Sequence, residues 1–126
     1  MPTAYAYIRY SSKAQGEAGR DSVDRQMASI QAITKQQGIE LPPENIYSDT
    51  GISAHDGSNK RKGKLKELID MISDMHIKEG DYIFVESIDR LSRQRLLQAK
   101  ELVNGILEKG VILITTIDGQ RYEKPN

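Results

Sequence analysis

The feature that most constrains the fold is the alternation of short apolar runs with amphipathic segments along the whole chain. Strands are predicted at residues 3–10, 45–48, 82–85 and 111–114, and the last two are continuous apolar runs typical of strands buried on both faces. Helices are predicted between them, from Asp21 or Ser22 to Gly38, over 65–72 and over 96–109. This βαβαβαβ order predicts an α/β fold: a mostly parallel central sheet of about four to five strands with helices on both faces.

The segments between these elements are polar. Residues 11–20 are predicted to form a loop, and 49–63 form a long loop with three glycines, a length more typical of functional loops than of simple connections. The last eight residues, 119–126, are polar and are expected to fray.

The composition fits one globular domain spanning residues 1–126. Lys and Arg together number 18, as do Asp and Glu, so any contact with DNA must come from local basic clusters or from another domain. The chain has no cysteine, and His55 and His76 do not form a metal-binding motif, so no metal site is predicted. Without a signal peptide or a long apolar run, a cytoplasmic location is expected.

Candidate functional residues follow the predicted strands, because ligands of such sheets gather at the carboxyl ends of the strands. They comprise a set of hydroxyls, guanidiniums and carboxylates: Arg9, Ser11 and Ser12 after the first strand, Asp49 after the second, and Glu86, Ser87, Asp89, Arg90 and Arg93 after the third.

Arg9 and Ser11 lie two residues apart, which places their side chains on the same side of an extended strand. An arginine beside a serine suits attack on a phosphate, because guanidinium donors pair with phosphate oxygens and stabilise the charge of the transition state. The alternative is structural: Arg9 pairs with Asp49 or Glu86 at the edge of the sheet.

Two further groups also allow a structural interpretation. Asp89 and Arg93 lie four residues apart, which suits either a phosphate site or a solvated helical salt bridge worth about 0.3–0.5 kcal/mol. The basic run 60–62 is either a ligand-binding segment or a solvated surface, and His55 is either a base or an ordinary loop residue. The chain has no GxxxxGK[ST] or GxGxxG phosphate loop.

Five segments, in order, resemble the N-terminal catalytic domain of the resolvase/invertase serine site-specific recombinases. Residues 7–12 with Gln15 resemble Y-x-R-x-S-[ST]-x-x-Q, and 22–26 resemble S-L-x-x-Q. Residues 47–53 resemble the D-x-G-[IY]-S loop, 61–63 resemble R-[PK]-G, and 88–93 resemble [LI]-D-R-[LI]-[SG]-R. The resemblance covers nearly the whole chain and favours the functional interpretation of these residues.

The resemblance implies roles for individual residues. Ser11 would attack a DNA phosphodiester, giving a 5′-phosphoserine link and a free 3′-hydroxyl. Arg9, Arg90 and Arg93 would hold the scissile phosphate. Asp89 would organise these arginines or help to protonate the leaving oxygen. Arg61 would be a further phosphate ligand and Gln26 would support the serine loop. The family needs no metal and no cofactor.

The long DxGIS loop and the long spacer between Ser11 and Ser22 resemble the large serine recombinases more than short resolvases. Family members continue into a long helix and DNA-binding domains, so we expect this chain to be part of a larger protein. The implied partners are DNA and further copies of the full-length protein, with the 126-residue chain alone expected to be monomeric. The resemblance also implies a bacterial, phage or mobile-element origin.

Two rival interpretations remain open. One is a non-enzymatic binding module of flavodoxin-like or receiver-like architecture, although a receiver needs clustered acids where this chain has Arg9 and Ser11. The other is a degenerate recombinase that binds partners without cutting DNA, against which the intact serine and arginines count.

Overall fold

The fold is a five-stranded sheet with helices on both of its faces, as predicted. The computed structural model describes residues 2–10, 17–50, 64–88 and 96–124. The elements in chain order are β1 (Ala4–Tyr10), α1 (Glu17–Gln37), a 3₁₀ turn (Pro43–Asn45), β2 (Ile46–Thr50), α4 (Lys64–Ser73), β3 (Tyr82–Val85), α5 (Leu96–Glu108), β4 (Ile112–Thr115) and β5 (Gln120–Tyr122). Within the described ranges, no helix has both the length and the apolar character that crossing a bilayer requires.

The strands follow the order β2-β1-β3-β4-β5, and the first four are parallel. Strand β1 is an interior strand, with Ala6 paired to Ile46 of β2 on one side and to Phe84 of β3 on the other. The chain therefore leaves β1 toward β2 and then returns across it to β3. This reversal creates a topological switch point between β1 and β3.

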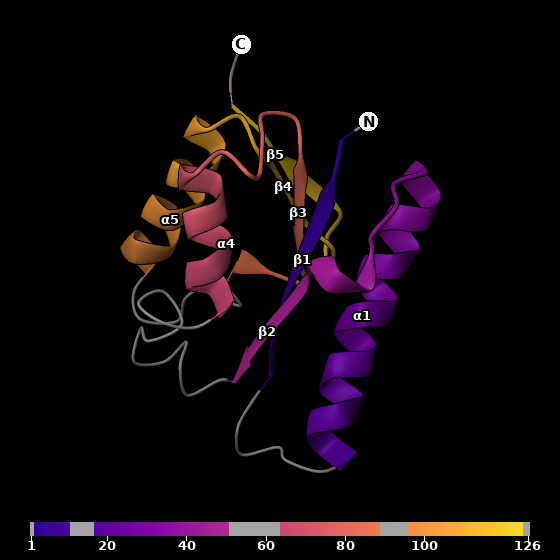
Figure 1. Ribbon diagram of the computed structural model, residues 1–126. Coiled ribbons are helices and arrows are strands. Elements are labelled where there is room, and N and C mark those ends of the chain that lie inside the picture. The colour runs from indigo at the N-terminus through magenta and orange to yellow at the C-terminus, as the bar shows by residue number, and fades with distance from the viewer. Residues whose placement is uncertain (1, 11–16, 51–63, 89–95, 125–126) are drawn as a thin grey trace.

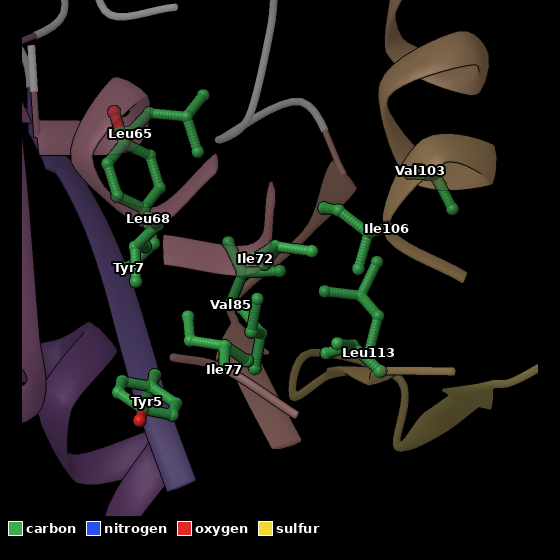
Figure 2. Close-up of a cluster of buried hydrophobic side chains, with 12 residues drawn as sticks. Tyr5, Tyr7, Leu65, Leu68, Ile72, Ile77, Val85, Val103, Ile106 and Leu113 are labelled. Atoms are coloured by element: carbon green, nitrogen blue, oxygen red, sulfur yellow. The ribbon is translucent and has the colours of Figure 1, made fainter. Parts of the chain in front are cut away.

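Alternate residues of each strand build two separate cores. On one face, Tyr5 and Tyr7 of β1 pack with Leu68 of α4 and Ile106 of α5, and Figure 2 shows these side chains in the layer between sheet and helices. On the other face, a smaller cluster contains Ile8 and Ile30. Figure 1 shows the consequence, with α1 on one side of the sheet and α4 and α5 on the other. The strict alternation fixes which side chains each helix meets.

Helix α1 begins earlier than the sequence predicted. The expected start was Asp21 or Ser22, whereas the helix starts at Glu17. Glu17, Ala18 and Arg20 are residue types of high helix propensity, and together they outweigh the low propensity of Gly19. The end was predicted correctly at Gly38, whose φ of 67° closes the helix while the Ile39 amide donates to the Thr34 carbonyl at 2.9 Å.

Strand β5 contradicts the expectation that residues 119–126 fray. The Asp118 carboxylate accepts hydrogen bonds from the Thr115 hydroxyl at 2.6 Å and from the Gln120 amide at 3.1 Å. Gly119 adopts a φ of 69°, which glycine tolerates without strain, so the chain turns back along β4 as an antiparallel strand. The Asp-Gly dipeptide is a hairpin signal that the sequence-based prediction overlooked.

Candidate functional site at the β1–β3 switch point

The carboxyl ends of β1 and β3 flank the switch point, where sheets of this order bind their ligands. Strand β1 ends at Tyr10, directly before Ser11, and β3 ends at Val85, from which Glu86, Ser87 and Ile88 lead to Asp89. Because the two strands are parallel neighbours, the segments that follow them leave the sheet at the same edge. The topology thus places the ends of β1 and β3, which precede the residues that the sequence singled out, at the same edge of the sheet.

Arg9 is a charged residue inside the protein, with only 2% of its surface exposed. Strand alternation places its side chain on the α4–α5 face of the sheet, together with Tyr5 and Tyr7. Burying a guanidinium is costly unless anionic or polar groups compensate it, so a structure keeps one there only for a partner or a ligand. The backbone register sets Arg9 opposite Asp49, which is one of the two structural partners that the sequence offered.

Gln26 lies in α1 on the opposite face and is completely buried. Its side-chain Nε2 donates to the backbone carbonyl of Arg9 at 2.9 Å, and its Oε1 accepts from the Arg9 backbone amide at 3.4 Å. The last paired residue of β1 toward β3 is Ala6, so the contact lies beyond the β1–β3 ladder. Gln26 thus holds the main chain of β1 two residues before Ser11.

Two other polar contacts join α1 to the same edge of the sheet, and sequence reasoning missed both. Arg25 forms an ion pair with Glu86, whose side chain is buried after β3, while 56% of the Arg25 side chain remains exposed. Ser29 donates a hydrogen bond to the Thr116 hydroxyl at 2.7 Å, just beyond β4. We call the three contacts made by Arg25, Gln26 and Ser29 the polar seam.

A local signal for the polar seam was present in the sequence. These residues occupy positions i, i+1 and i+4 of a helix, immediately around the inward-facing apolar stripe of Met27, Ile30 and Ile33. Polar side chains beside an apolar stripe can form hydrogen bonds to strand ends, or they can be exposed to solvent. The choice between these depends on the sheet order, which the sequence alone does not specify.

The remaining predicted site residues lie outside the described residues: Ser11, Arg61, Asp89, Arg90 and Arg93. Tyr10 and Ile88, which directly precede Ser11 and Asp89, are described, and Arg61 lies three residues before the start of α4 at Lys64. Of the predicted set, the structure describes Arg9 and Gln26, and it brings the side-chain amide of Gln26 to the backbone of Arg9.

Comparison with known proteins gives a family match and a curated relative. The family model described as "Resolvase, N terminal domain" matches residues 4–126. The uncharacterized protein YbcK of Escherichia coli (strain K12) is 35% identical over 122 residues, covering 97% of this chain but only 24% of that protein. The chain therefore spans about a quarter of the length of this relative.

Two solved structures share the fold. The N-terminal catalytic domain of TP901-1 integrase superposes with a TM-score of 0.69 at 20% identity, covering 94% of this chain and 80% of that one. A resolvase family site-specific recombinase from Streptococcus pneumoniae gives a TM-score of 0.71 at 19% identity, covering 100% of this chain and 79% of that one. These likenesses bear out the predicted α/β architecture with its mostly parallel sheet.

Proposed function

Because the chain belongs to the resolvase N-terminal domain family, we propose that it is the catalytic domain of a serine site-specific recombinase acting on DNA. The observation that carries the proposal is the buried guanidinium of Arg9 at the carboxyl end of β1, two residues before Ser11 and at the switch point of the sheet. A fixed cation there suits a ligand with a phosphate group. The two structural neighbours, named as an integrase domain and a site-specific recombinase, support the same assignment.

In the proposed reaction the Ser11 Oγ attacks the phosphorus of a DNA phosphodiester. The Ser11 Oγ–phosphorus bond forms as the hydroxyl gives up its proton, the bond from phosphorus to the 3′ oxygen breaks, and the departing 3′ oxygen takes up one proton, so that no net proton is consumed. The products are a 5′-phosphoserine link and a free 3′-hydroxyl, which conserve the bond energy, so that a later attack by a 3′-hydroxyl rejoins the strand. Arg9, Arg90 and Arg93 would neutralise the charge that builds on phosphorus, where one well-placed donor is worth roughly 10²–10³-fold in rate.

Supporting roles follow the same chemistry. Asp89 would orient the arginines beside it or deliver the proton to the leaving oxygen, and Arg61 would contact a further phosphate oxygen. Gln26 would fix the β1 backbone that leads into the serine segment, a role that its two bonds to Arg9 support. The proposed reaction uses no metal and no cofactor.

The alternative function is a non-enzymatic binding module, which the observed strand order also permits because flavodoxin-like and receiver-like folds share it. Receivers require clustered acids after the first strand, whereas this chain has Arg9 there. The family match and this substitution of a cation for acids favour the recombinase.

The test is covalent capture of DNA by the full-length protein. The protein is incubated with a plasmid carrying the DNA that flanks its own gene, the reaction is stopped with detergent, and DNA bound to protein is recovered. We expect the wild type and Ser12→Ala to give covalent product, and Ser11→Ala to give none while its DNA affinity is kept. Covalent product from Ser11→Ala would overturn the mechanism, with Ser12 as the next candidate nucleophile.

A further inference from the structure

The polar seam connects the middle of α1 to three different strands at one edge of the sheet. Gln26 contacts the backbone of β1, Arg25 contacts the residue after β3, and Ser29 contacts a residue after β4. All three contacts lie on the α1 face, at the carboxyl ends of the strands. The middle of α1 therefore sets the relative positions of these strand ends.

The contact between Arg25 and Glu86 differs from the other two in charge and in location. Glu86 is only 4% exposed, so its carboxylate carries a large desolvation cost that the Arg25 guanidinium helps to offset. The backbone at this point is also held from the other side, since the Ile117 amide donates to the Glu86 carbonyl at 3.0 Å. Glu86 is thus fixed both through its side chain and through its main chain.

Along the chain, each partner belongs to a part of the structure that adjoins one of the two stretches of proposed catalytic residues. Helix α1 follows the segment that carries Ser11, and Glu86 lies three residues before Asp89. Adjacent residues of one helix make both contacts: Gln26 hydrogen-bonds the backbone of β1, and Arg25 forms the ion pair with the residue after β3. A displacement of either strand end relative to α1 would change the spacing between the nucleophile and the arginines that hold its target.

We propose that Arg25 and Glu86 form a positioning pair that fixes the carboxyl end of β3 relative to β1 and so aligns Asp89, Arg90 and Arg93 with Ser11. The inference rests on the proposed function and deepens it. Neither residue need touch DNA, because the pair acts through the chain that follows Glu86. Alignment of this kind affects rate strongly, since a misplacement on the order of 1 Å can cost about a hundredfold in catalysis.

The test is a double-mutant cycle on the single-turnover rate of covalent product, measured with the full-length protein and the flanking-DNA plasmid. We expect Arg25→Ala and Glu86→Gln each to slow the reaction about tenfold, and the double variant to be slowed by about the same factor, because the two side chains act as one unit. DNA affinity should be unchanged, and Arg25→Lys should restore most of the rate, because the contact involves a single nitrogen.

Ser29→Ala is the matched control. It removes a contact of the same helix with the chain after β4, which leads to no proposed catalytic residue. We expect it to lower thermal stability without slowing the reaction. Slowing by Ser29→Ala equal to that by Arg25→Ala would mean that loosening α1 anywhere impairs the reaction, which would overturn the specific role of the pair.

Amide hydrogen exchange gives a readout that does not depend on DNA. The Ile117 amide, bonded to the Glu86 carbonyl, should exchange faster in Arg25→Ala and return toward the wild-type rate in Arg25→Lys. Unchanged exchange and unchanged rates, or a double variant slowed about a hundredfold as for independent residues, would reject the positioning pair. A wild type that forms no covalent product would instead reject the proposed function, and with it the role assigned here.

Discussion

The side-chain amide of Gln26 hydrogen-bonds both the backbone carbonyl and the backbone amide of Arg9. Gln26 reaches Arg9 from one face of the sheet, and the side chain of Arg9 lies on the other face. The contact uses only main-chain atoms of Arg9. One residue of β1 is therefore held by α1 through its backbone, while its guanidinium lies on the α4–α5 face. This arrangement separates the group that fixes the strand from the group that carries the charge.

Removal of the Gln26 amide should destabilise the domain. Gln26→Leu keeps the approximate volume but leaves the buried carbonyl of Arg9 without this donor, at a cost of about 1–3 kcal/mol in the free energy of unfolding. Denaturant titration followed by circular dichroism measures the loss. Gln36→Leu, at an exposed position of the same helix, should change stability by less than about 0.5 kcal/mol. Equal effects from both variants would show that the buried contact contributes nothing specific.

The arginines after β3 should affect rate rather than DNA affinity. We expect Arg93→Ala to slow covalent product formation by about 10²–10³-fold, because it removes a donor to the charged transition state. Arg93→Lys should recover part of the loss, since a lysine restores charge without the paired donors of a guanidinium. The control is Lys109→Ala, an exposed cation beyond the end of α5. A rate for Arg93→Ala within about twofold of the wild type would remove Arg93 from the proposed site.

The turn between β4 and β5 should weaken in acid. Hydrogen bonds from the Thr115 hydroxyl, and then from the Gln120 amide, hold the pKa of Asp118 below its ordinary value of 3.8. A carboxylate whose pKa is lowered by folding stabilises the protein fully above that ordinary value, and this contribution disappears as the pH falls through the folded-state pKa.

The measurement is urea unfolding of the wild type and Asp118→Asn between about pH 7 and pH 2. Asp118→Asn should be the less stable near neutral pH, and the difference should shrink as the pH drops below 3.8. Glu108→Gln, at an exposed position at the end of α5, serves as the control. A difference that stays constant over the whole range would show that ionisation of Asp118 does not contribute.

The 126-residue chain should bind DNA weakly by itself. Its formal net charge is zero, and affinity for DNA comes mostly from neutralising several phosphates. We expect no band shift at physiological salt below about micromolar protein, and a monomer or a weak dimer by sedimentation. Nanomolar, sequence-specific binding by these residues would show that they carry a recognition surface of their own.

The sequence predicted the buried elements well because apolar periodicity is a local signal. Strand β3 has the predicted bounds, since four consecutive apolar residues fit only an interior strand there. The predicted start of α1 and the expected fraying in place of β5 were wrong, because each depends on turn and end effects in a polar segment, where hydrophobic periodicity gives no guidance.

The residues of the candidate site also divide into those that the sequence identified and those that it missed. Arg9 was identified from its place at the end of a predicted strand and Gln26 from the family resemblance, and the structure adds the contact between them. Arg25, Ser29 and Thr116 were missed because their partners lie between 61 and 87 residues away in sequence, a separation that only the sheet order brings together. The roles of Ser11, Arg61, Asp89, Arg90 and Arg93 stay predictions.

The hairpin that adds β5 also determines how the domain behaves toward other copies of itself. Without β5, the apolar strand β4 would form the rim of the sheet and offer its unpaired backbone groups to any extended chain, which is how aggregation between sheets begins. The covering strand is only three residues long and carries Arg121, which pairs with Glu123, so the rim it presents is short and charged. Ending the chain before Gln120 would therefore expose the unpaired backbone groups of β4 to pairing with other extended chains.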